Sequence, residues 1–151
     1  PEIKNLLTRF PKIKLALSLH SAREEIHSLI VPISKTYNLK ALQATLLELT
    51  KDYNTENNYI FLEYLMIDGI TDTDADIEAL KNWCAPLPIH LNIIKYNPAP
   101  EENKLKPSSD KQIEHFIEQL KPHIASITTR YSLGSGITAA CGQLASKTSN
   151  K

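Results

Sequence analysis

Cysteine and glycine are scarce in this chain of 151 residues, which has two cysteines and four glycines. Two thiols, Cys84 and Cys141, are too few for a disulfide framework, for a structural zinc site or for the ligands of a 4Fe-4S cluster. The sequence also has no GxxxxGK[ST] phosphate loop, no HExxH metal motif and no GxSxG nucleophile elbow. The sequence therefore gives no local support for a phosphate-loop nucleotide site, an HExxH metal site or a GxSxG serine nucleophile.

Long apolar runs are missing as well. No stretch is long enough to cross a bilayer, and the first residues, PEIKNLLTRF, lack the three-part layout of a signal peptide. We therefore expect a cytosolic protein without a membrane partner. With 42% hydrophobic residues the chain can bury a core, so we expect one domain over 1–151, with a mobile Ser/Lys-rich tail after about residue 145.

Charge of neither sign is in excess, because 17 basic residues balance 17 acidic ones. Nucleic-acid binding usually relies on an excess of Lys and Arg, so this balance gives no support for an RNA partner. Acids nevertheless dominate between Glu48 and Glu78, and bases outnumber acids from Lys104 onward. One basic edge could face RNA, although ordinary solvated helix faces explain the same pattern.

Strand and helix patterns alternate along the chain. Apolar and β-forming residues predict strands at 13–19, 59–67, 89–94 and 124–129, and helical spacing predicts helices at 22–29 and 39–49. Two further helices are expected, one running from a cap at Thr71 or Thr73 to about Trp83, the other from Ser108 or Ser109 to about Leu120.

This alternation predicts an α/β fold with a parallel sheet and flanking helices. In such folds active groups gather at the carboxyl ends of the strands. Three polar residues fall at predicted strand ends: His20, Asp68 and Asn97. Glu63 and Asp68 have an odd separation in the strand pattern, which indicates opposite faces, so we do not assign them catalysis as a pair.

The thiol of Cys141 lies in the small-residue run AACGQLA, after a segment that contains Gly134 and Gly136. Glycine permits backbone conformations in which a substrate approaches closely, so this sulfur is a candidate nucleophile. The ordinary interpretation of a free cysteine is a small buried hydrophobe. We favour that interpretation for Cys84, in NWCAP.

Four motifs resemble one enzyme family in the same order: ALSLH at 16–20, EYLMIDGITD at 63–72, NIIKYNPAP at 92–100 and AACGQLA at 139–145. Together they are similar to the RlmN/Cfr radical SAM RNA methyltransferases. The resemblance covers nearly the whole chain but only the second half of such an enzyme, because the family's CxxxCxxC motif is missing. It implies the C-terminal half of a partial (β/α)6 radical SAM barrel.

The resemblance also implies the chemistry. A cysteine matched by Cys141 takes a methyl group from one S-adenosyl-L-methionine (SAM), a radical derived from a second SAM activates that methyl group, and the carbon adds to adenine. A second, upstream cysteine then releases the product by forming a disulfide with Cys141. The 4Fe-4S cluster that this requires has its ligands in the missing N-terminal part, so this fragment alone is expected to be inactive.

Residues of two motifs are implied to bind SAM: Ser18, Leu19 and His20 at the end of the first predicted strand, and Asn97 after the third. Taken alone, a Ser-x-His at a strand end and an Asn before proline are more often structural. Arg130 matches a family arginine and is a candidate for phosphate contact. At 133–137 this chain has LGSGI, whereas the family commonly has an RGxDI-like stretch. This difference bears on the implied substrate contacts more than on the implied role of Cys141.

The implied substrate is an adenine of 23S rRNA, methylated at C2 as in the RlmN branch, with tRNA as a second candidate substrate. The implied partner besides RNA is the N-terminal half of the same enzyme. Two alternatives remain open: methylation at C8, as in the Cfr branch, or a split or degenerate fragment that only binds SAM or docks to another half.

Overall fold

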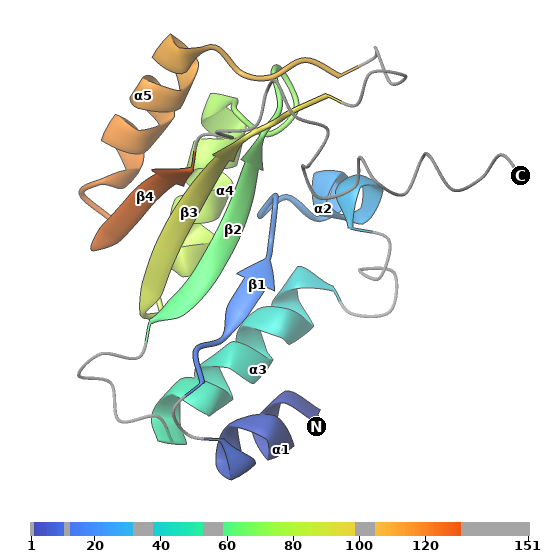
Figure 1. Ribbon diagram of the computed structural model, residues 1–151, viewed down its shortest axis with the longest axis vertical. Helices are drawn as coiled ribbons and strands as arrows, with labels where there is room; N and C mark the ends of the chain where they lie inside the picture. Colours follow the sequence, from blue (N-terminus) through green and yellow to red (C-terminus); the bar gives the residue numbers. More distant parts are fainter. Residues whose placement is uncertain (1, 11–12, 32–37, 53–58, 99–104, 131–151) are drawn as a thin grey trace, which may run out of the picture.

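The described part of the chain forms five helices and four strands. The computed structural model describes residues 2–10, 13–31, 38–52, 59–98 and 105–130. Within these ranges the elements follow one another in the order α1 (Glu2–Arg9), β1 (Ala16–Ser18), α2 (Glu24–Ile30), α3 (Leu39–Asp52), β2 (Ile60–Met66), α4 (Asp74–Cys84), β3 (Ile89–Lys95), α5 (Asp110–Leu120) and β4 (Ser126–Arg130) (Figure 1). None of the described helices is long and apolar enough to span a membrane.

The four strands form one parallel sheet in the order β1-β2-β3-β4. This confirms the α/β fold with a parallel sheet and flanking helices. Because every strand runs in the same direction, all four carboxyl ends lie at one end of the sheet. Strand β1 is at one edge of this sheet, with β2 as its partner among the described strands.

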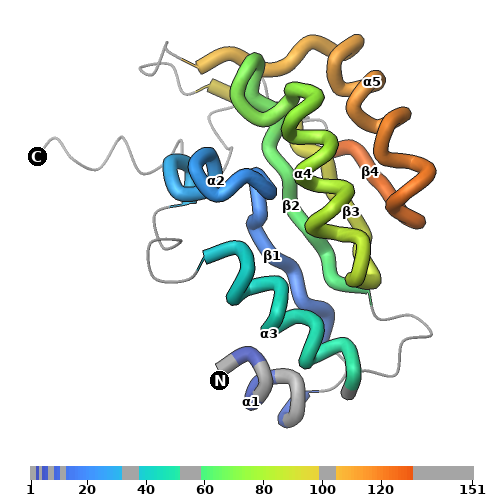
Figure 2. Tube along the Cα trace, turned by 180° about the vertical axis from the view of Figure 1, so that it is seen from behind, coloured from blue at the N-terminus to red at the C-terminus, as the bar shows by residue number. Residues whose placement is uncertain are grey.

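The two faces of the sheet have different surroundings. In β2 the residues alternate strictly between buried and partly exposed, with Ile60, Leu62, Tyr64 and Met66 buried. Helices α3, α4 and α5 cover the face to which these residues point (Figure 2). No described helix covers the opposite face, to which Phe61 and Glu63 belong (Figure 1). We call this second face the open face.

The starts of two helices are fixed by hydroxyl groups. Thr73 precedes α4, where its side chain accepts from the backbone N–H of Asp76 and the Asp76 carboxylate accepts from the Thr73 N–H, which is a capping box. Ser109 caps α5 by accepting from Gln112 N. The capping residues are therefore Thr73, not Thr71, and Ser109, not Ser108. Thr71 instead lies buried, and its hydroxyl donates to Leu65 O and accepts from Ile67 N.

Two elements differ most from expectation. Strand β1 starts three residues later and ends one residue earlier than the predicted 13–19; at its end the chain turns after Ser18, where the N–H groups of Leu19 and His20 both donate to the carbonyl of Glu63. Helix α1 was not predicted at all. It is a short amphipathic helix, and the packing of Ile3 against the core explains its stability better than local propensity does.

The interpretation of Cys84 as a packing residue is confirmed. Its side chain lies in the core at the end of α4, and burial raises the pKa of the thiol to about 12. It forms no disulfide with any described residue, and because its pKa is raised the thiol stays protonated and unreactive near neutral pH. Cys141, and the tail after residue 145 that we expect to be mobile, lie outside the described residues.

Candidate functional site

A tight turn follows β1 at the carboxyl end of the sheet. The N–H groups of Leu19 and His20 both donate to Glu63 O at 3.1 Å, and Ser21 N donates to Leu19 O at 2.7 Å. His20 has a φ of 56°, in the left-handed region that residues other than glycine rarely adopt. Such a conformation persists only where neighbouring contacts hold it, and it is a frequent feature of functional sites.

His27 of α2 is one of the residues that hold this turn. Its side chain is buried, and Nδ1 lies 2.7 Å from the carbonyl oxygen of Leu19. Because a carbonyl only accepts, Nδ1 of His27 carries the proton and donates it. The Ser21 hydroxyl supports the other end of the turn by accepting from Arg23 N at 3.1 Å.

The imidazole of His20 itself is available for another contact. Its Nδ1 is buried and has no hydrogen-bond partner among the described residues. Burial lowers the pKa of His20 from its ordinary 6.5, His27 lowers it further, and the carboxylate of Glu63 acts in the opposite direction. The imidazole is therefore predominantly neutral at pH 7 and can accept one hydrogen bond and donate another.

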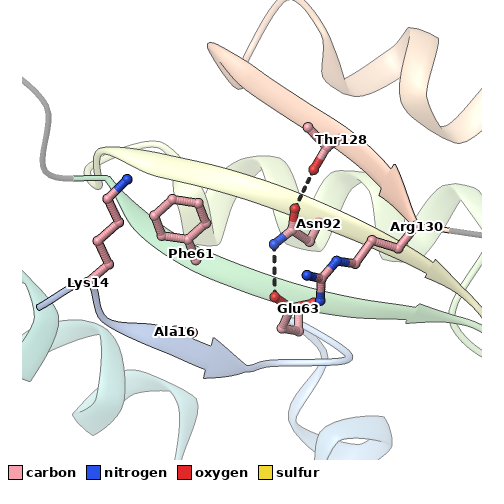
Figure 3. A pocket seen from close by; sticks show the side chains of 7 residues that line it. All are labelled: Lys14, Ala16, Phe61, Glu63, Asn92, Thr128 and Arg130. Carbon is pink, nitrogen blue, oxygen red and sulfur yellow. Dashed lines mark hydrogen bonds between the residues drawn. The ribbon is translucent and has the colours of Figure 1, made fainter. Parts of the chain in front are cut away.

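A row of polar residues crosses the open face at the level where β1 ends. The register pairs Ser18 with Glu63, Glu63 with Asn92, and Asn92 with Thr128. Asn92 Nδ2 donates to Glu63 Oε1 at 2.8 Å, and the Thr128 hydroxyl donates to Asn92 Oδ1 (Figure 3). We call these four residues the polar row.

One step nearer the amino ends of the strands lies a second set of side chains. His90 Nδ1 is 2.7 Å from Ser126 Oγ, and its ring lies 4.7 Å from that of Phe61, measured between centroids. His90 Nε2 lies 3.2 Å from Asn92 Oδ1 and 3.1 Å from Thr128 Oγ1, so this set supports the polar row.

The open face forms a pocket of about 490 Å³, within the range of small-molecule sites. Its lining residues come from all four strands and from the segment before β1: Lys14, Ala16, Phe61, Glu63, Asn92, Thr128 and Arg130 (Figure 3). Two of them are cationic and one is anionic, so the pocket has a mixed polar wall. The described residues contain no group of three or more His, Cys, Asp or Glu side chains that could hold a metal ion.

The predicted site residues are placed as follows. Ser18 is exposed on the open face, His20 lies in the turn close to Glu63, and Leu19 is fully buried, so that Leu19 contributes its backbone rather than its side chain. Asn97 is partly buried, two residues beyond β3 and at the same end of the sheet as His20. Cys141 lies outside the described residues.

The polar row beyond Ser18 was missed by sequence reasoning. Glu63 and Asn92 each interrupt an otherwise apolar strand, IFLEYLM and IHLNIIK, and such an interruption was the available signal. The comparison of Glu63 with Asp68 was uninformative, because β2 ends at Met66 and Asp68 is an exposed loop residue whose N–H donates to Lys106 O.

Replacing His27 tests how the turn is held. His27→Leu removes the side-chain donor to the buried carbonyl of Leu19 and leaves Ser21 N as its donor, so we expect the free energy of unfolding to fall by about 0.5 to 1.5 kcal/mol. His27→Asn places an amide N–H where Nδ1 lies and should recover part of that loss, whereas His27→Gln extends its amide past this position. Urea unfolding of the three variants measures the difference, and equal losses in Asn and Gln would contradict the assigned donor.

Several known proteins are similar to this chain, although no protein-family model matches it. A probable RNA methyltransferase from Rhodopirellula baltica is 39% identical over 139 residues, which are 92% of this chain and 36% of the relative. Probable dual-specificity RNA methyltransferases RlmN from Cytophaga hutchinsonii and Clostridium beijerinckii are each 38% identical, over 90% and 95% of this chain and 36% and 40% of their own length.

Solved structures agree with these sequence relatives. The crystal structure of a radical SAM methyltransferase from Sphaerobacter thermophilus superposes with a TM-score of 0.84 at 33% identity, covering 94% of this chain and 41% of that one. A domain of a pyruvate-formate lyase-activating enzyme from Bacteroides vulgatus gives a TM-score of 0.63 at 18% identity, which shows the fold alone. The chain spans about two-fifths of the curated relatives it matches, and over that span it is a homologue of the RlmN-type radical SAM RNA methyltransferases with part of the radical SAM barrel fold.

Proposed function

We propose that this chain is part of a radical SAM RNA methyltransferase that transfers a methyl group to C2 of an adenine in 23S rRNA, with tRNA as a second candidate substrate. Ser18, His20 and Asn97, with the backbone at Leu19, hold SAM, and Cys141 carries the methyl group. The observation that carries this proposal is the left-handed turn at His20, at the carboxyl end of a parallel sheet, whose imidazole Nδ1 has no hydrogen-bond partner among the described residues.

The residues present fit an adenosyl ligand. Ser18 contributes an exposed hydroxyl, and His20 a neutral imidazole whose Nδ1 has no partner in the described part of the chain. Asn97 contributes an amide that can donate to and accept from an adenine edge. The pocket on the open face is next to the first two of these residues, since it includes Glu63, the register partner of Ser18. When bound, SAM would supply the methyl group and also an adenosyl group that can take up a hydrogen atom.

The described residues do not fit a 4Fe-4S cluster. Cys84 is buried in the core, and no metal-binding group of side chains occurs in the described ranges. We therefore assign no step to the cluster here. The residue of this chain that takes part in methyl transfer is Cys141. Its sulfur can become methylated and so bring a carbon atom to the adenine.

The role of Cys141 is tested by mass spectrometry of the complete gene product isolated from cells. We expect the peptide that contains Cys141 to carry one added methyl group on sulfur. Cys84 is the internal control, because its buried thiol of raised pKa should remain unmodified until the protein is unfolded. An unmethylated Cys141 in protein that binds SAM, or methylation of both cysteines to the same extent, would overturn the assignment.

A further inference from the structure

Arg23 lies at the junction between the turn after β1 and helix α2. Its N–H donates to the Ser21 hydroxyl at 3.1 Å, and its carbonyl accepts from His27 N at 2.8 Å. Arg23 is the N-cap residue of α2, but its side chain forms no capping hydrogen bond there. The backbone of Arg23 is therefore bonded to the turn on one side and to the helix that supplies His27 on the other, so its position affects both.

The guanidinium of Arg23 extends to the start of α4. Nη1 lies 3.5 Å from Asp76 Oδ2, and Nε donates to Glu25 Oε1 at 3.0 Å. The side chain of Asp76 is fully buried, whereas that of Glu25 is 68% exposed. A buried carboxylate is costly without a counter-charge, and an exposed ion pair contributes little. The contact with Asp76 is therefore the stronger constraint on where Arg23 lies.

Asp76 is itself held in place. Its Oδ2 accepts from both the N–H and the hydroxyl of Thr73, within the capping box of α4. Thr71 anchors the loop before α4 to the end of β2, because its hydroxyl bonds to two backbone groups there. The ion pair therefore ties the turn after β1 to a part of the molecule that is fixed to the sheet.

The turn needs such a restraint. The φ of 56° at His20 is unfavourable for a residue with a side chain, and this conformation persists only where surrounding contacts impose it. Strand β2 holds the turn at its start, where the N–H groups of Leu19 and His20 donate to Glu63 O. The ion pair of Arg23 holds it at its other end. Without that second restraint we expect the backbone at His20 to relax, which would move its imidazole.

Neither Arg23 nor Asp76 lines the pocket on the open face. An effect of these residues on a ligand would therefore pass through the turn. We propose that Arg23 is a positioning residue for SAM binding, which through its ion pair with Asp76 holds the turn at His20 in the left-handed conformation. This inference rests on the proposed function and assigns a role in ligand binding to two residues outside the pocket.

The test is calorimetric titration of the complete gene product with S-adenosylhomocysteine. We expect Arg23→Gln to weaken binding about 3- to 30-fold, as for side chains that alter a site without touching its ligand. Asp76→Asn keeps an oxygen that can accept from Thr73 N–H but removes the charge, and it should weaken binding by a similar factor. Because both changes break the same ion pair, the double variant should bind no more weakly than either single variant.

Glu25→Gln is the matched control. It alters the exposed partner of Arg23 and should change the affinity less than about 2-fold. Titration also separates positioning from support of the fold, since partial unfolding lowers the fraction of competent protein and leaves its affinity unchanged. Amide hydrogen exchange follows the turn directly. The N–H groups of Leu19 and His20 should exchange faster in Arg23→Gln, with those of β3 unaffected.

An unchanged affinity in Arg23→Gln would overturn the inference. Additive losses in the double variant, or a loss of the same size in Glu25→Gln, would show that Arg23 does not act through Asp76 and would overturn it as well. A wild-type protein that does not bind S-adenosylhomocysteine would instead refute SAM binding itself, and with it the proposed function.

Discussion

An alanine at position 141 is expected to abolish methyl transfer to RNA, lowering the rate by more than about 10³-fold, while SAM is still bound. C2 of adenine is electrophilic and does not attack a methyl sulfonium as ordinary nucleophiles do, and in the proposed function the carbon is therefore first held on the sulfur of Cys141. Serine cannot replace the thiol, because its oxygen neither takes up nor releases the methyl group in the same way. The measurement follows labelled methyl from SAM into RNA, with the complete gene product reconstituted without oxygen.

Cys84→Ala is the matched control for this loss. The side chain of Cys84 is buried in the core, so its removal should cost about 1 kcal/mol of stability and leave the rate per folded molecule unchanged. Activity that survives in Cys141→Ala would contradict the assigned role of the thiol. Digestion of the RNA product to nucleosides distinguishes 2-methyladenosine from 8-methyladenosine and so decides between the C2 and C8 alternatives.

Replacing Asp76 by alanine is expected to lower the free energy of unfolding by about 2 to 4 kcal/mol. The Asp76 side chain is fully buried, and its Oδ2 accepts from the N–H and hydroxyl of Thr73 and lies 3.5 Å from Nη1 of Arg23. Its loss removes the capping box of α4 and leaves Arg23 without this partner. Because the Arg23 side chain is 25% exposed, water compensates in part, which places the expected value below that of a fully buried pair.

Asp74 provides the control for Asp76 on the same helix turn. Its side chain is 92% exposed, so Asp74→Ala should lose less than about 1 kcal/mol, mainly from the helix dipole. Denaturant unfolding of both variants, and of Arg23→Gln alone and with Asp76→Ala, gives the coupling between the two charges. Additive effects in this cycle would show that the ion pair contributes nothing and that capping alone explains the loss.

Local signals in the sequence predicted most of the secondary structure. Strands β2 and β3 were expected within one residue of their observed ends, because runs such as IFLEYLM and IHLNIIK combine β-forming residues with clear flanking turns. The capping residues Thr73 and Ser109 were each one of two candidates, since neighbouring hydroxyl residues give the same sequence signal. Helix α1 lacks such a capping signal in the sequence, and the contact of its Ile3 with the core is tertiary.

The candidate site was predicted only in part. Ser18 and His20 were identified from a motif, and the structure places them where the sheet ends. The left-handed backbone of His20 and the buried donor of His27 carry no sequence signal that distinguishes them from ordinary residues. Glu63 was set aside because it was compared with Asp68 along its own strand rather than with residues on neighbouring strands.

The alternation of strands and helices, the order of the motifs and the presence of a thiol among small residues can be read from local sequence, because each depends on residues close together in the chain. Which polar side chains meet depends instead on how distant segments pack. Glu63 and Asn92 are 29 positions apart, and Asn92 and Thr128 are 36 apart, so their hydrogen bonds depend on the register of parallel strands. That register follows from packing the buried faces of the strands against α3, α4 and α5, which no single segment specifies alone.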